Sequence, residues 1–246
     1  MKREWSALIF AMTFPTVMTW FYFVALARPQ VAPATESIAA PENFWVQTAY
    51  GAGKAIQFSF PVLFLALVEP RSLRLGRPRT NGMVLGIGSG LLVGVGIFVL
   101  YWAGLRYWLI DLGTATRIRG KIEEFNCATP IRYVGLAGFL AVGHSLLEEY
   151  YWRWFVFGRL RRLLSLPFAA TLSSLAFMAH HVIVLGQFFP NDFWTAAVPF
   201  SIGIAVGGGF WAWLYDRSGS IYSPWLSHLL VDVAIMAIGY DLVFNR

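Results

Sequence analysis

The sequence places eight ionisable side chains within three long apolar stretches. In chain order they are His144, Glu148, Glu149, Arg153, His180, His181, His228 and Asp232. A charge in the hydrocarbon core of a membrane is costly, so such residues usually line a functional or water-filled cavity. Carboxylates and imidazoles can activate water and hold a developing oxyanion, which amide hydrolysis requires. These residue types therefore predict a hydrolytic site within an apolar protein.

Helical spacing assigns the side chains of the first stretch to faces, because residues three or four positions apart are neighbours on a helix. Glu148 shares a face with His144, and Glu149 shares a face with Arg153. Glu149 and Arg153 are expected to form an ion pair that neutralises both charges. We expect His144 to be a helix-packing histidine, and His180 to be a packing or interface residue.

The three strongest candidates lie at a common depth. At about 1.5 Å per residue, Glu148, His181 and His228 are about 16, 21 and 14 Å from the expected ends of their helices. Among the remaining apolar stretches, Lys54 is the main ionisable residue, expected near the outer end of its span. Three helices that offer catalytic-type side chains at one depth indicate a shared site.

Each candidate has a chemical role in the predicted hydrolysis. Glu148 is expected to take the proton from water, with His181 orienting or sharing that water. His228 is expected to donate to the oxyanion, and Asp232, one helical turn away, to fix the orientation of His228. Asp232 is the less certain partner, because an aspartate donates only when it is protonated.

The composition predicts that membrane-spanning helices position these side chains. Hydrophobic residues make up 57% of the 246 residues and charged residues only 13%, against roughly 25% charged residues in soluble domains. A membrane-spanning helix needs about 20 apolar residues, so the chain has room for six to eight. We expect one all-α, polytopic integral-membrane domain over residues 1–246, with its catalytic motifs in residues 131–232. The predicted spans are Ser6–Ala27, Gly53–Val68, Gly82–Ala103, Ile131–Gly158, Pro167–Gln187, Phe193–Leu214 and Ile221–Val243, and an alternative start of the second span lies nearer Phe44.

The basic residues predict the orientation of these spans. Lys and Arg at the N-terminus, at 71–79, at 159–162 and at Arg217 fall on one side if seven spans alternate, and that side is cytoplasmic by the positive-inside rule. Basic residues at 106–121 fall on the other side, so either 114–126 is an interfacial helix or a span is miscounted. This distribution explains the net charge of +6 without a nucleic-acid partner. We expect a multi-pass protein of the bacterial cytoplasmic (inner) membrane.

The N-terminal span and the single cysteine set further limits. The stretch 6–27 ends in an A-x-A pattern, but it is longer than the apolar region of a signal peptide, so we expect an uncleaved first span. Cys127 is the only cysteine, which excludes an intramolecular disulfide and Cys-rich zinc or iron–sulfur sites. Glycines at 82–96 lie in an apolar span, where small residues let helices approach closely.

Three motifs give the chain a resemblance to a known family. Glu148–Arg153 fits EExxxR, Phe177–His181 fits FxxxH and His228–Asp232 fits HxxxN/D. Together they resemble the CAAX-protease and bacteriocin-processing (CPBP) family of intramembrane endopeptidases. The resemblance implies a helical membrane fold that cleaves a membrane-associated peptide or protein. It implies that Glu148 and His181 activate water, that His228 and Asp232 form the oxyanion site, that Glu149 assists, and that Arg153 and Phe177 support the site.

Three questions stay open from the sequence. The family is described both as glutamate-type and as metal-dependent; a metal, if used, would be zinc, held by Glu148, His181 and His228, although no HExxH motif is present. A transporter or proton relay also uses intramembrane carboxylates and histidines, and a non-catalytic membrane adaptor could share the scaffold. Finally, the site is expected to open toward the cytoplasmic side. A cysteine in place of Trp152 or Trp225 should then react with a polar thiol reagent added from that side.

Overall fold

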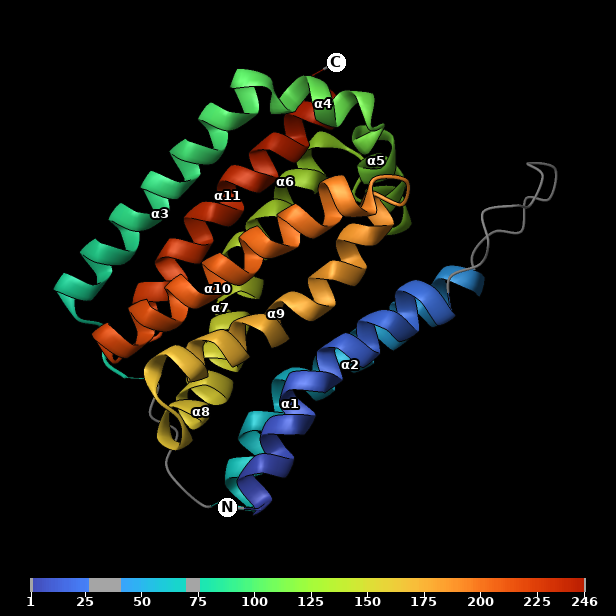
Figure 1. Ribbon diagram of the computed structural model, residues 1–246. Helices are drawn as coiled ribbons and strands as arrows, with labels where there is room; N and C mark the ends of the chain where they lie inside the picture. Colours follow the sequence, from blue (N-terminus) through green and yellow to red (C-terminus); the bar gives the residue numbers. More distant parts are fainter. Residues whose placement is uncertain (1, 27–40, 70–75, 246) are drawn as a thin grey trace.

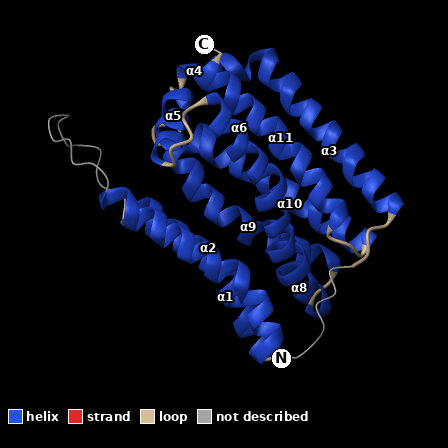
Figure 2. Cartoon of the chain, turned by 180° about the vertical axis from the view of Figure 1, so that it is seen from behind, coloured by secondary structure: helices blue, strands red, loops and turns tan. Residues whose placement is uncertain are grey.

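The computed structural model describes residues 2–26, 41–69 and 76–245, and within these ranges every regular element is a helix (Figures 1 and 2). Seven of the helices are long and apolar enough to cross a membrane. This confirms the all-α, polytopic prediction of about seven spans. The spans are Lys2–Ala25, Gln47–Leu67, Thr80–Asp111, Pro130–Leu163, Leu166–Phe188, Phe193–Ser218 and Tyr222–Phe244.

The first three spans form an N-terminal hairpin and a long helix that is kinked at Gly104. The hairpin pairs α1 (Lys2–Trp20), extended by the π-helical η1 (Phe21–Ala25), with α2 (Pro41–Leu67). It lies to one side of the other helices (Figure 1). The third span consists of α3 (Thr80–Leu100), η2 (Tyr101–Leu105) and α4 (Arg106–Asp111). The end of the predicted signal-like pattern, at 27, and most of the loop 28–42 lie outside the described residues.

The fourth span carries the EExxxR motif and is irregular. It runs without a break through α6 (Pro130–Gly138), η3 (Phe139–His144), α7 (Ser145–Glu148), η4 (Glu149–Phe157) and α8 (Gly158–Leu163). Both η3 and η4 are π-helical, a conformation that is rare and often occurs at functional sites. The irregular backbone therefore coincides with the predicted catalytic residues.

The last three spans complete the bundle. They are α9 (Leu166–Phe188), then η5 (Phe193–Ala197) continued by α10 (Val198–Ser218), and α11 (Tyr222–Phe244). Polar contacts fix one end: Arg159 Nη1 lies 2.7 Å from Glu69 Oε2 and 3.8 Å from Glu4 Oε1. These contacts join α8, the end of α2 and the start of α1, as the alternation of spans predicts.

The opposite end is fixed by a second set of contacts. Arg106 Nε lies 2.9 Å from Asp241 Oδ2 at the C-terminal end of α11. Arg117 donates to the carbonyl of Phe188 at the end of α9, over 3.0 Å. Arg117, Arg119 and Lys121 belong to α5 (Thr114–Glu124), a separate short helix. Three of the basic residues on this side therefore belong to a non-spanning helix, Arg106 lies near the end of the third span, and the described residues contain seven spans.

Small residues set the position of α11, the helix that carries His228. A Cβ added to Gly90 of α3 would lie 2.8 Å from Cα of Ser227, and one added to Gly86 would collide with the Ser223 carbonyl. Ser223 donates to the carbonyl of Gly82 over 2.7 Å. The predicted close approach at these glycines is thus confirmed, and it holds α3 against α11.

Candidate functional site

Glu148 ends α7 near the middle of the fourth span, and its side chain is buried. Oε2 lies 3.8 Å from Nε2 of His228, and Oε1 lies 3.9 Å from Nε2 of His144. Both separations exceed hydrogen-bond length but suit a bridging group such as water. Glu148 therefore has an imidazole on either side, one from its own helix and one from α11.

His228 is held by Glu149. His228 Nδ1 donates to Glu149 Oε1 over 2.8 Å, while Glu149 Oε2 lies 3.3 Å from Nε of Arg153. All three side chains are buried, Glu149 completely. Since Glu149 accepts the hydrogen bond from Nδ1 of His228, the other ring nitrogen of His228 is directed toward Glu148. The predicted Glu149–Arg153 ion pair is present, and it is part of a longer chain that reaches the imidazole.

Aromatic rings support this charged chain. The Arg153 guanidinium lies 4.7 Å from the ring centroid of Phe177 and 5.1 Å from that of Trp211. The Trp211 ring stacks on His228 with centroids 3.9 Å apart. Cation–π contacts of this kind are strongest where water is excluded. Phe177, which was predicted to support the site, thus contacts Arg153, and Trp211 is a second contact that the motifs did not indicate.

His181 has a defined tautomer. Its Nδ1 lies 2.9 Å from the carbonyl oxygen of Phe177, one turn earlier on α9. A carbonyl only accepts, so Nδ1 carries the hydrogen and Nε2 presents a lone pair. Nε2 can therefore accept a hydrogen from water, which is the property that the predicted role of His181 needs.

Asp232 lies beside His228, as their spacing on one helix predicts, but not at hydrogen-bond length. Asp232 Oδ1 lies 3.6 Å from Nε2 of His228, beyond hydrogen-bond length, whereas Glu149 bonds the opposite nitrogen. The expected orientation of His228 by Asp232 is therefore replaced by orientation through Glu149. The i,i+4 rule compares residues on one helix only, so it could not detect a partner on another span.

The residues that could hold a metal also differ from the predicted set. Ligand atoms of Glu148, His180 and His181 all lie within 4.8 Å of one another. His180 is buried, stacks on Trp152 with rings 6° from parallel, and has no hydrogen-bond partner for Nδ1 among the described residues. The predicted third ligand, His228, is not in this group, although its Nε2 lies 3.8 Å from Glu148 Oε2. His180 takes its place because adjacent residues on α9 both reach Glu148.

Two further residues approach the site. His144, expected to be a packing residue, contacts Glu148 as described above, and its ring lies 6.2 Å from that of Phe58 on α2. Lys54 lies seven residues inside its span, deeper than expected, because the span begins at Gln47, between the two predicted starts at Gly53 and near Phe44. A longer second span therefore brings a cation to the depth of the site.

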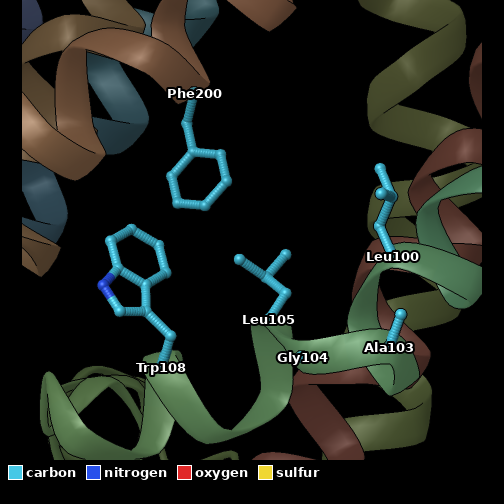
Figure 3. Close-up of a pocket in the computed structure, with 6 residues that line it drawn as sticks. All are labelled: Leu100, Ala103, Gly104, Leu105, Trp108 and Phe200. Atoms are coloured by element: carbon cyan, nitrogen blue, oxygen red, sulfur yellow. The ribbon is translucent and has the colours of Figure 1, made fainter.

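An apolar pocket lies away from these residues. It is lined by Leu100, Ala103, Gly104, Leu105, Trp108 and Phe200 (Figure 3). The adjacent Arg106 contacts Asp241, which is about 20 Å beyond His228 along α11 at 1.5 Å per residue. The pocket therefore belongs to the end of the bundle that carries α4 and α5, and it is separate from the buried Glu148 group.

Comparison with known families agrees with the motifs. Residues 130–234 match the family model described as type II CAAX prenyl endopeptidase Rce1-like. The matched segment contains all three motifs, and it confirms the predicted resemblance. It supports a CAAX-protease-like hydrolase that is an integral, multi-pass membrane protein. Searches of the curated proteins and of the solved structures gave no match.

Proposed function

We propose that this chain, a CAAX-protease-like membrane hydrolase by its family match, is an intramembrane endopeptidase that uses Glu148-activated water. Its substrate would be a membrane-associated peptide or protein. One observation carries the proposal: Glu148 is buried at mid-span between imidazoles from its own helix, from α9 and from α11. An unpaired carboxylate is costly there, and general-base chemistry would account for its retention.

The geometry supports a simple sequence of steps. A water molecule that donates one hydrogen to Glu148 and the other to His181 Nε2 keeps its lone pairs free to attack a peptide carbonyl. Glu148 takes the proton, the hydroxide oxygen bonds to the carbonyl carbon, and the carbonyl oxygen becomes an oxyanion. His228 donates to that oxyanion from Nε2. Glu148 then passes the proton to the amide nitrogen as the C–N bond breaks.

Glu149 and Arg153 would set the charge on His228. Donation from Nε2 requires the imidazolium form, because Nδ1 already donates to Glu149. Glu149, Glu148 and Asp232 surround the ring with carboxylates, which favours that form. Arg153 balances the charge of Glu149. In this proposal Glu149 positions a charged donor, and Asp232 contributes through its negative field.

A zinc-dependent form of the same hydrolysis has its own support. Two imidazoles and a carboxylate are a ligand set found in zinc hydrolases, with water in the fourth position. Glu148, His180 and His181 offer that set, and the Nδ1 atom of His180 is buried without a partner. A zinc ion held there would supply Lewis-acid activation of water. The residues of this chain would keep the roles described for His228 and Glu149.

Hydrolysis can be tested directly with purified protein in liposomes. Proteomic comparison of membranes with and without the active enzyme would supply a candidate substrate. Cleavage of that substrate in ¹⁸O-labelled water is expected to place one ¹⁸O atom in the new carboxyl group, measured by mass spectrometry. Metal content and chelator sensitivity of the same sample would separate the two forms. Substrate that is transported or bound but never cleaved would contradict the proposal and favour a transporter or an adaptor.

Access from the basic end of the bundle gives a further prediction. Trp225 lies one turn before His228 toward that end and is half-buried, so Trp225→Cys, with Cys127 replaced, should react with a polar thiol reagent added from the cytoplasmic side. Trp152 is buried and stacks on His180, so it is unsuitable as the reporter that its sequence position suggested.

The control for this labelling lies at the opposite end. Tyr107 on α4 is 69% exposed, and Tyr107→Cys should react only from the other side of the membrane. Labelling is measured by mass shift in right-side-out and inside-out vesicles. Reaction of Trp225→Cys only from the side that labels Tyr107→Cys would contradict the access route, although the catalytic roles could still hold.

A further inference from the structure

Lys54 places a positive charge inside a membrane span, where burying a charge is energetically costly. It lies seven residues inside the span Gln47–Leu67, about 10 Å from the nearer end of that span at 1.5 Å per residue. Lysine side chains near helix ends can extend to the membrane surface, but Nζ of Lys54 lies by the ring of Phe58, one turn deeper in the span. A lysine kept at this position therefore needs a local partner for its charge.

The described residues provide only weak partners. Nζ of Lys54 lies 5.9 Å from the ring centroid of Tyr50 and 5.5 Å from that of Phe58, both on α2. No carboxylate of the described residues comes within the 4.0 Å of an ion pair with Lys54. Cation–π contacts offset part of the cost of burying an ammonium group. The aromatic rings hold the charge in place without neutralising it.

The lysine faces the catalytic group. The Phe58 ring, which contacts Lys54, also lies 6.2 Å from the His144 ring and 6.1 Å from that of Tyr151 on the fourth span. His144 in turn contacts Glu148. The charges of Lys54 and Glu148 are close enough to interact, although they form no ion pair. Lys54 thus borders the reacting region on the α2 side.

We propose that Lys54 is a specificity residue that binds a carboxylate of the peptide substrate and so positions the scissile bond against Glu148. This inference rests on the proposed endopeptidase function. A lipid phosphate is a poorer match, because headgroups lie beyond the ends of the span and Lys54 is about 10 Å inside the nearer end. A peptide held for cleavage at Glu148 reaches that depth, and its carboxylate would complete the missing ion pair.

The carboxylate can come from two parts of a peptide. One is the α-carboxylate of a C-terminus close to the cut, and the other is an acidic side chain. The probe is therefore a mixed-sequence set of short, N-palmitoylated peptides, each made with a C-terminal carboxylate and with a C-terminal amide. A second set, all amides, carries Glu or Gln at one internal position.

Binding is measured without turnover. The peptide pairs compete for immobilised Glu148→Gln protein in lipid nanodiscs, and mass spectrometry gives the ratio of carboxylate to amide form retained. A charge-assisted bond to Lys54 is expected to favour the carboxylate by about 10- to 100-fold. The ratio should fall to near one in Glu148→Gln/Lys54→Met and be largely kept in Glu148→Gln/Lys54→Arg.

Two comparisons make the result decisive. Lys121→Met, the same substitution on α5, should leave the carboxylate preference unchanged, since Lys121 pairs with Glu124 outside the spans. In the active protein, Lys54→Met should act mainly on KM for the preferred peptides. A ratio near one for both peptide sets before Lys54 is changed, or an unchanged ratio after the change, would overturn the inference. Because binding is measured without cleavage, this failure is distinct from failure of the endopeptidase function.

Discussion

Glu148→Gln is expected to lower kcat for cleavage by about 10²- to 10⁴-fold, the usual contribution of a general base. The amide of glutamine keeps the shape of the side chain but cannot take a proton from water. His181→Ala removes the lone pair that orients the water. His228→Ala removes the oxyanion donor, a loss of about 10²- to 10³-fold. Each rate is measured with purified protein in liposomes on one substrate.

The controls separate chemistry from folding. Glu123→Gln makes the same substitution at an exposed position of α5 and should retain activity. All three site variants should insert into membranes as folded proteins. Glu148→Gln and His181→Ala should show thermal unfolding close to that of the parent protein, whereas His228→Ala should lose some stability, because it also removes the hydrogen bond to Glu149 and the ring that stacks on Trp211. Activity near the parent level in any one of them would remove that residue from the proposed mechanism.

Arg153→Ala is expected to destabilise the protein by about 3–5 kcal/mol, the usual effect of removing one partner of a buried ion pair. Glu149 is fully buried, and Arg153 is the cation at its Oε2 atom. The guanidinium also fills the space between Phe177 and Trp211, so the alanine leaves a cavity in addition to an unpaired charge. Thermal unfolding in detergent, followed by circular dichroism, measures the loss.

A double-mutant comparison assigns this loss to the ion pair. Arg153→Ala/Glu149→Gln should recover part of the stability, because the remaining side chain is neutral. Arg161→Ala is the matched arginine control: Arg161 pairs with Asp216 over 3.0 Å but is 41% exposed, and such pairs contribute about 0.2–1 kcal/mol. A stable Arg153→Ala protein that loses only activity would indicate instead that Arg153 contacts the substrate.

The two neighbouring glutamates are both buried, but they have different partners. Glu148 has no hydrogen-bonded partner among the described residues and lies among imidazoles, whereas Glu149 is bonded to His228 and paired with Arg153. Glu149→Gln should therefore reduce activity by disturbing the charge on His228. The proposed division is a reactive carboxylate beside a positioning one, both within the π-helical part of the fourth span.

The sequence by itself determined the class of the protein and the depth of its polar residues. Apolar runs of about 20 residues must form helices in a membrane, since every backbone polar group needs an internal partner there. That constraint is local to each run, so seven spans, the Glu149–Arg153 pair and the close approach at Gly90 could be predicted. The motifs likewise belong to single helices, and the family match follows from them.

Only the tertiary structure decided which helices face one another. The partner of His228 proved to be Glu149 on another span, and His180 joined Glu148 and His181 in place of His228. The length of α2, which places Lys54 beside the site, depends on residues before Gly53 that are less apolar than the rest of the span. Contacts between helices arise from packing angles and from π-helical turns, and periodicity within one helix carries no information about either.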